Sequence, residues 1–259
     1  MAGPTLYPEV NALLDTLLSS AQSVLAGRFV GLYLYGSLAS GDFDPATSDI
    51  DFLVVTADEI PAELVPALEA MHARLAAEGG KWAQKLEGRY LPLRALRRLN
   101  HSDPPRPCLN EGQFYLGRQE SDWVIQRHVL REKGAAVAGP SLRPWIDPVQ
   151  PDELRQAVTG ILREWWLPLV ELSDPRLRCS DYQAFAILTM CRALHTLNSG
   201  AIVSKPVAAR WASAVLGEPW APLIERALAW RPGEPFDALD QTREFIWYVL
   251  GRAQTLEGR

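Results

Sequence analysis

The 259-residue chain has little of what metal-stabilised, disulfide-bonded or membrane proteins need. It has four histidines and three cysteines, Cys108, Cys179 and Cys191, with no Cys-x-x-Cys pair among them, which argues against structural zinc and favours reduced thiols. No apolar run approaches the roughly 20 residues of a membrane span. The first eight residues lack a basic segment followed by an apolar one, so we expect no signal peptide and a cytoplasmic protein.

The chain also lacks an excess of positive charge. Its 26 Lys and Arg face 31 Asp and Glu, giving a net charge of −5 and a pI near 5.5. Wide contact with a nucleic-acid backbone requires clustered cations, so we expect no nucleic-acid partner. The one locally basic stretch, Arg94 to Arg106, we interpret as a solvated loop. An acidic cleft would attract a cationic small molecule. We expect a monomer or a weak dimer.

Two short motifs, Gly36-Ser37 and Ser48-Asp49-Ile-Asp51, carry most of the chemical information. The apolar residues 29–35 predict a strand that runs into the Gly-Ser turn, and residues 50–56 predict a second strand. Residues two apart in a strand point to the same side, about 6.5–7 Å apart. Asp49 and Asp51 can therefore converge on one cation, and Mg²⁺ suits two carboxylates combined with substrate phosphates.

The Gly-Ser turn supplies the anion-binding half of such a site. Gly36 permits a tight turn, and a helix beginning at Ser37 would direct free N–H groups at a phosphate. A Gly-Ser turn alone often only reverses the chain, and Asp-x-Asp alone often caps a strand. Together and in this order they favour a nucleoside triphosphate site with a bound metal.

This arrangement resembles the nucleotidyltransferase superfamily, which includes DNA polymerase beta and the aminoglycoside nucleotidyltransferases. The family pattern continues with a third carboxylate on a later strand, and Glu87 in the strand-like run 86–92 matches it. The resemblance implies that Asp49, Asp51 and Glu87 hold the metal. It also implies that Glu87 is the general base, that Gly36, Ser37 and Ser48 bind the nucleotide, and that ATP is the co-substrate.

The hydrophobic periodicity predicts an α+β protein. Helices are expected over 10–25, from Pro61 to Gly79, and from a cap at Ser121 to Lys133. The Pro- and Gly-rich segment 137–152 is the candidate linker. Beyond it the chain predicts helices only, over 152–170, 182–198, after a cap at Ser204, and from Pro219 and Asp237. We therefore expect a small mixed-sheet nucleotidyltransferase domain over 1–150 and an all-helical domain over 151–259.

A second resemblance covers most of the chain. The streptomycin and spectinomycin adenylyltransferases show Leu-Thr-x-x-Arg followed by Thr-x-x-x-Gly-x-x-x-Ser-Lys, and here the same residues run from Leu188 to Lys205. The resemblance implies that Lys205 reaches the nucleotide phosphates. Those enzymes place an acidic residue and a histidine just before this segment, whereas this chain has Tyr182-Gln-Ala-Phe185 there. Asp181 and Glu111 are the remaining candidates for binding the acceptor.

These residues predict Mg²⁺-dependent transfer of AMP from ATP to a hydroxyl of a small cationic molecule. The acceptor would be an aminoglycoside or aminocyclitol antibiotic, held between the two domains, as in a resistance enzyme. One alternative is an AMP-transferring enzyme that acts on a protein, and another is a non-catalytic nucleotide-binding module. Most tryptophans are expected in the core, although one of them, or Tyr90, is a candidate for stacking on a bound ring. His72 is expected to be solvated.

Overall fold

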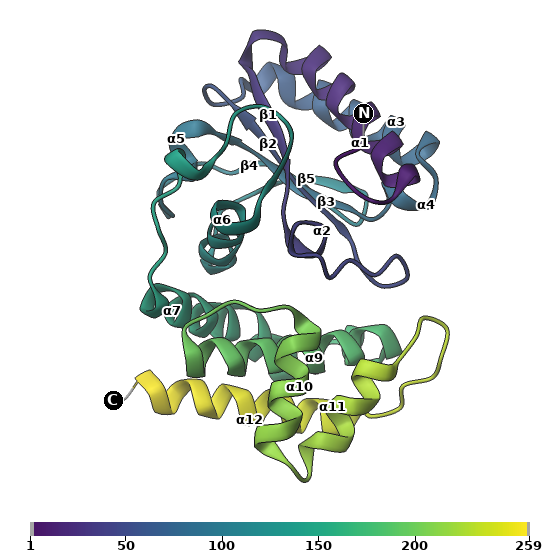
Figure 1. Ribbon diagram of the computed structural model, residues 1–259, viewed down its shortest axis with the longest axis vertical. Coiled ribbons are helices and arrows are strands. Elements are labelled where there is room, and N and C mark those ends of the chain that lie inside the picture. Colours follow the sequence, from purple (N-terminus) through teal and green to yellow (C-terminus); the bar gives the residue numbers. More distant parts are fainter. Residues whose placement is uncertain (1–2, 258–259) are drawn as a thin grey trace. The chain divides into compact units, whose positions relative to one another are not determined.

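The computed structural model describes residues 3–257 and divides into two compact units, one ending at Pro148 and the other beginning at Val149. The first unit is built on a six-stranded sheet, and the second consists of helices (Figure 1). The predicted α+β class, with a mixed-sheet domain followed by helices, is confirmed. Over residues 3–257 no helix is both long enough and apolar enough to span a bilayer.

The sheet of the first unit has the strand order β5-β4-β3-β2-β1-β6. Its strands are β1 (Phe29–Leu34), β2 (Ile50–Thr56), β3 (Leu86–Pro92), β4 (Arg106–Asn110), β5 (Gln113–Gly117) and β6 (Ala135–Ala138). The central neighbours β2 and β3 run parallel, and every other neighbouring pair is antiparallel. The two strands that carry the candidate carboxylates therefore lie side by side in the middle of the sheet.

Helices cover both faces of this sheet (Figure 1). On one face α1 (Pro8–Leu25) and α3 (Val65–Glu78) bury their leucines against Phe52 and Val54. On the other face α6 (Ser121–Lys133) packs Trp123 against a core that contains Leu53 and Val55. Successive strand residues point to opposite faces, so the consecutive apolar residues in the middle of β2 contribute side chains to both cores.

The segment expected to be a linker is partly built into the first unit. Its start lies in β6, which pairs with β1 at the edge of the sheet. Tyr33 of β1 donates a hydrogen bond from its hydroxyl to the carbonyl of Pro140, at 2.7 Å. Three short helices complete the unit: α2 (Gly36–Ser40), α4 (Gly80–Ala83) and α5 (Leu93–Leu96).

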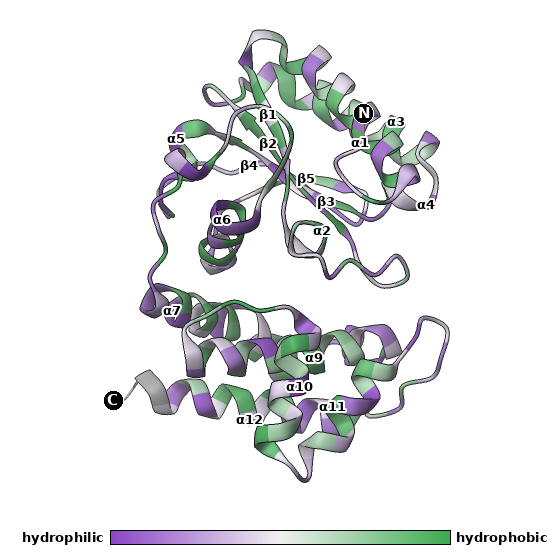
Figure 2. Ribbon diagram, viewed as in Figure 1, coloured by the Kyte–Doolittle hydropathy of each residue, from purple (hydrophilic) through white to green (hydrophobic). Residues whose placement is uncertain are grey.

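The second unit is arranged around α9, which packs against α7, α10, α11 and α12. Its helices are α7 (Pro151–Ile161), α8 (Leu167–Glu171), α9 (Ser180–Ser199), α10 (Lys205–Leu216), α11 (Trp220–Ala229) and α12 (Leu239–Glu257). Hydrophobic and hydrophilic bands alternate along α9 and α12, as expected for helices with one buried face (Figure 2). Gly200, in the left-handed conformation with φ 67°, ends α9 as predicted.

The helix predicted over 152–170 differs from the observed structure. It begins at Pro151, because Gln150 and Glu153 form a reciprocal capping box. It is then interrupted by a π-helical turn at Leu162–Trp166. Pro168 lacks the N–H that would bond to the carbonyl four residues earlier and its ring would clash with that carbonyl, so widening the helix relieves the conflict.

Candidate active site

The parallel pairing of β2 and β3 sets Asp51 directly opposite Glu87. Neighbouring strands lie about 4.8 Å apart, and paired residues project from the same face, so these carboxylates are close neighbours. Both residues are half-buried. Asp49 precedes β2 by one residue and is exposed. The structure therefore brings Asp51 and Glu87 together at the amino ends of two central strands. Asp49 lies two residues before Asp51 in the chain.

Gly36 lies against the Asp51 carboxylate. It begins α2 with φ at 61°, and a Cβ added to it would lie 1.8 Å from Oδ2 of Asp51. The preceding N–H, that of Tyr35, donates to the Asp51 carbonyl at 3.2 Å. The expected short helix after the Gly-Ser turn is present, with Ser37 half-buried within it. The missing side chain of Gly36 lets the Asp51 carboxylate pack directly against the backbone of the turn.

The loop before Asp49 is held by its own hydrogen bonds. The Oγ of Ser48 accepts from the N–H of Asp44 at 3.0 Å, and the N–H of Ser48 donates to the Asp44 carbonyl at 2.8 Å. The ammonium of Lys85, just before β3, donates to the carbonyls of Ser48 and Ala46 at 3.1 and 3.3 Å. Ser48 thus shapes the approach to Asp49, and its predicted contact with the nucleotide stays a prediction. Lys85 was missed by the sequence reasoning.

An ion pair between a largely buried arginine and a partly exposed aspartate lies beside the two carboxylates. Arg89 shares the face of β3 that carries Glu87, and its Nη2 lies 3.1 Å from Oδ2 of Asp122 on α6. Burial is the largest single effect on Arg89 and opposes its charge, but Asp122, Tyr35, Cys108 and Tyr115 together outweigh burial, and the pKa of the guanidinium is raised. Gln126 also donates to Asp122, at 2.9 Å. This basic group was missed too, although a charged residue two positions after Glu87 in an otherwise apolar strand was a usable signal.

Tyr35 adds a neutral hydroxyl to the same region. Burial, followed by the negative charge of Asp51, raises the pKa of its phenol well above the ordinary value, against the opposing effect of Arg89. The phenol therefore remains protonated at neutral pH. The charge of the site is then carried by the carboxylates and by Arg89.

The donor set fits a magnesium ion bound jointly with a substrate. Within residues 3–257, no three carboxylate, imidazole or thiol side chains converge closely enough to hold a metal by themselves. Mg²⁺ in nucleotide sites is bound by one or two carboxylates, with phosphate and water oxygens completing its shell. Asp51 and the neighbouring Asp49 supply the carboxylates for such a site.

The remaining predicted residues are on other elements of the two units. Glu111 is exposed, with φ at 48°, in the turn between β4 and β5. In the helical unit, Asp181 is exposed in the first turn of α9, where its Oδ1 accepts from the N–H of Tyr182 at 2.8 Å. Lys205 is the first residue of α10, after the predicted cap Ser204, whose Oγ accepts from the N–H of Val207. Glu111 belongs to the sheet unit, and Asp181 and Lys205 belong to the helical unit. Their joint contact with an acceptor or nucleotide stays a prediction.

Two expectations about residues outside the motifs, Tyr90 and His72, are wrong. Tyr90 is 1% exposed, and its hydroxyl lies 2.7 Å from Nε2 of His72, so it is not available for stacking on a bound ring. His72 is itself 2% exposed and not solvated. Position 72 lies on the same helical face as Leu68 and Leu75, which turns its imidazole into the core.

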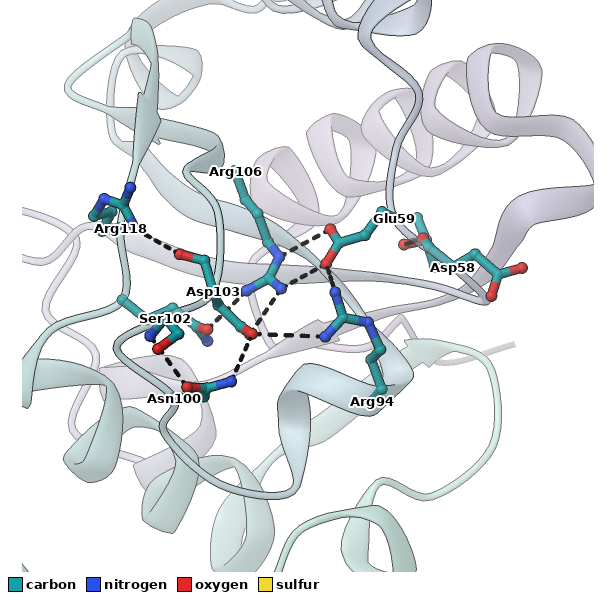
Figure 3. Close-up of polar contacts among 10 residues, drawn as sticks. Asp58, Glu59, Arg94, Asn100, Ser102, Asp103, Arg106 and Arg118 are labelled. Carbon is teal, nitrogen blue, oxygen red and sulfur yellow. Dashed lines mark hydrogen bonds and ion pairs between the residues drawn. The ribbon is translucent and has the colours of Figure 1, made fainter.

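A third correction concerns the basic stretch 94–106. Figure 3 shows Arg106 within a polar cluster, where it binds both Glu59 and Asp103 through Nη2, at 2.6 and 2.8 Å. Its side chain is 4% exposed, so it is not part of a solvated loop. Arg94 also pairs with Glu59. This cluster borders a cavity of about 210 Å³ near Pro92, at the opposite end of β3 from Glu87, and so apart from the candidate site.

Comparisons with known proteins agree with this geometry. Residues 25–98 match the nucleotidyltransferase domain family, and residues 145–253 match the family described as aminoglycoside adenylyltransferase, C-terminal domain. An aminoglycoside (3'') (9) adenylyltransferase of Escherichia coli is 27% identical over 265 residues, covering 97% of each chain. A spectinomycin 9-adenylyltransferase of Campylobacter jejuni is 25% identical over 231 residues, covering 82% of each.

The fold has a solved counterpart. The crystal structure of spectinomycin adenyltransferase AAD(9) from Enterococcus faecialis with ATP and spectinomycin superposes with a TM-score of 0.74. The match covers 94% of this chain and 98% of that one, at 19% sequence identity. One family model thus matches part of the sheet unit, and the other matches mainly the helical unit. Together these matches support an aminoglycoside adenylyltransferase-like nucleotidyltransferase, and the chain is an enzyme with nucleotidyltransferase activity.

Proposed function

We propose that the protein transfers AMP from ATP to a hydroxyl of a small cationic acceptor of the aminoglycoside or aminocyclitol class, in a Mg²⁺-dependent reaction. The observation that carries this proposal is the register that sets Asp51 opposite Glu87, next to the side-chain-free Gly36. The relatives named as aminoglycoside and spectinomycin adenylyltransferases support the acceptor class. The net charge of −5 is compatible with a cationic acceptor.

In the proposed reaction Asp49, Asp51 and Glu87 would hold Mg²⁺ together with the triphosphate of ATP. When bound, the metal would supply charge neutralisation of the triphosphate and of the leaving pyrophosphate. Glu87 accepts the proton of the acceptor hydroxyl, while the oxygen of that hydroxyl bonds to the α-phosphorus. The bond from the α-phosphorus to the bridging oxygen breaks, and pyrophosphate departs.

The other predicted residues bind the two substrates. Gly36, Ser37 and Ser48 contact the nucleotide from the sheet unit, and Lys205 binds its phosphates. Glu111 and Asp181 bind the ammonium groups of the acceptor. A hydrogen bond between a carboxylate and an ammonium group contributes about 1.5–3 kcal/mol.

Among possible acceptors, we favour spectinomycin over streptomycin. The streptomycin- and spectinomycin-modifying family has an acidic residue and a histidine where this chain has Tyr182 and Phe185. Here those two rings lie 5.6 Å apart and both contact Trp166, so this part of α9 presents aromatic rings in place of polar groups. The loss of a carboxylate and an imidazole removes two partners for a strongly cationic guanidino group.

The test is to incubate the protein with ATP, Mg²⁺ and a panel containing spectinomycin, streptomycin and other aminoglycosides, and to look for AMP adducts by mass spectrometry. We expect an adduct of at least one panel member and none with Glu87→Gln. Intact-protein mass measured in the same mixtures detects AMP transfer to protein. If ATP binds and no panel member gains AMP, the acceptor class is wrong. AMP found on protein and on no panel member would favour the protein-modifying alternative.

A further inference from the structure

The start of α10 is joined to the start of α9 by a cation lying over an aromatic ring. The ammonium nitrogen of Lys205 lies 4.2 Å from the centre of the Phe185 ring. Lys205 is the first residue of α10, and Phe185 lies in the second turn of α9, against which α10 packs. The contact is therefore fixed at both backbones by the packing of two long helices.

A lysine at this position needs a compensating partner. The N-terminal end of a helix carries a partial positive charge, which disfavours an ammonium group in the first turn. The lysine stem also has several rotatable bonds and a mobile, strongly hydrated head. The negative face of an aromatic ring attracts a cation within about 6 Å of its centre. The Phe185 ring thus offsets the unfavourable helix end and restricts the ammonium group to one region.

The ring itself is anchored. Its centre lies 6.1 Å from that of Trp166, with the planes 27° apart, and 5.6 Å from that of Tyr182. Trp166 is 2% exposed, whereas Phe185 is 41% exposed. A buried tryptophan therefore orients a ring that reaches the surface, and that ring holds the cation.

We infer that Phe185 is a positioning residue for nucleotide binding, which keeps the ammonium group of Lys205 in place for the phosphates of ATP. The inference rests on the proposed role of Lys205. A side chain that is already restricted loses less rotamer freedom when it binds its ligand. Phe185 need not touch ATP for this effect. Its contribution then exists only while Lys205 is present.

The experiment is a double-mutant cycle on the full chain, with the affinity for a non-hydrolysable Mg²⁺–ATP analogue measured by calorimetry. Phe185→Leu removes the ring and keeps an apolar side chain, and we expect it to weaken binding about two- to five-fold. Phe185→Tyr keeps the ring and should retain the affinity. In the Lys205→Ala background, Phe185→Leu should change nothing. Adenosine, which has no phosphate, should bind the Leu variant unchanged.

Two further measurements separate positioning from a purely structural role. The ε-methylene protons of Lys205 should show an upfield ring-current shift by NMR that Phe185→Leu abolishes. Trp247→Leu removes a ring of similar exposure, 44%, from α12 and should leave ATP affinity unchanged.

The outcomes are distinguishable. If Phe185→Leu weakens ATP binding equally with and without Lys205, Phe185 does not act through the lysine and the inference is overturned. If Lys205→Ala weakens binding and Phe185→Leu does not, the inference alone fails. If Lys205→Ala leaves ATP affinity unchanged, the proposed role of Lys205 fails, and the inference fails with it.

Discussion

Gly36 and Asp51 are packed so closely that the site has no room for a side chain at position 36. A Cβ there would lie 1.8 Å from Oδ2 of Asp51 and 2.6 Å from its Cγ. The backbone at Gly36 also has φ at 61°, a conformation that non-glycine residues rarely adopt. The glycine thus meets two needs at once, the left-handed turn and the close approach of the Asp51 carboxylate to the backbone.

Gly36→Ala is therefore expected to lower turnover by about 100-fold or more, because displacing a catalytic group by about 1 Å has an effect of that size. The matched control is Gly41→Ala. Gly41 also has a positive φ, 80°, but a Cβ there meets nothing within 4 Å. Both variants should lose about 1–3 kcal/mol of stability to backbone strain, and only the first should lose activity. Equal activity in the two variants would contradict the role given to Gly36.

Substitutions of the two facing carboxylates, Asp51 and Glu87, are expected to have different effects on transfer and on ATP binding. Glu87→Gln cannot take a proton and should lower the rate of transfer about 10²–10⁴-fold, while ATP still binds. Asp51→Asn should abolish transfer and also raise the Mg²⁺ concentration needed for ATP binding. Both residues are half-buried beside a polar site, so the fold should be retained. Near-native turnover of Asp51→Asn would show that the metal site has been misassigned.

Lys85 is expected to matter through the loop that leads to Asp49. Lys85→Met keeps the apolar stem but removes the hydrogen bonds to the carbonyls of Ser48 and Ala46. We expect a three- to ten-fold loss of kcat/KM and a stability loss of about 1 kcal/mol. Lys81→Met is the matched control, because Lys81 is 71% exposed and pairs only loosely with Glu9, at 3.6 Å. Similar losses in both variants would argue against the loop-bracing role.

The motif region was predictable because its signals are local. An apolar strand, a Gly-Ser turn and Asp-x-Asp at strand spacing predict the candidate site and its i, i+2 carboxylates. The pairing of Asp51 with Glu87 depends on which distant strands become neighbours, and spacing does not encode that. The resemblance to the nucleotidyltransferases was needed to single out Glu87. Arg89 had a usable signal in its position two residues after Glu87, whereas Lys85 became visible only through its hydrogen bonds to the carbonyls of Ser48 and Ala46.

Other features were missed because tertiary packing overrides composition. The segment 110–118 gave no clear period, since the outer strand β5 alternates weakly and most of it is exposed. Arg106 sits among prolines and was interpreted as solvated, whereas acidic partners from separate segments make its burial possible. His72 was the avoidable error, because its spacing from Leu68 and Leu75 is that of a buried helix face.

The stability of the protein is expected to fall in mild acid because of His72. Burial lowers the pKa of its imidazole from 6.5 to about 4. The unfolded chain therefore binds a proton that the folded protein does not, and stability present above pH 6.5 is lost as the pH falls toward 4. At pH 5 this group alone accounts for a loss of about 2 kcal/mol. Urea unfolding at pH 7 and pH 5 measures the difference.

A substitution isolates this contribution from that of the carboxylates. His72→Gln keeps a hydrogen-bond partner for the Tyr90 hydroxyl and does not titrate. It should reduce the loss of stability between pH 7 and pH 5 by about the same 2 kcal/mol. His101→Gln, at an exposed position, should leave the pH dependence unchanged. An unaltered dependence in His72→Gln would mean that the imidazole is not held neutral.

The cluster around Arg106 is expected to control stability without affecting catalysis (Figure 3). Arg106→Met would leave Asp103, which is 8% exposed, without its nearest cation. Breaking a buried pair by removing one partner costs about 3–5 kcal/mol. Arg94 also reaches Asp103, at 3.6 Å, so we expect a loss near the lower end of that range.

Two comparisons test the origin of that loss. Adding Asp103→Asn to Arg106→Met removes the stranded charge and should recover part of the stability, whereas Arg94→Met, at a side chain 56% exposed, should cost less than about 1 kcal/mol. Because Arg106 lies at the opposite end of the strands from Asp51 and Glu87, the folded Arg106→Met protein should keep the wild-type kcat. A kcat reduced at temperatures where the variant is fully folded would mean that the two ends of the sheet are coupled.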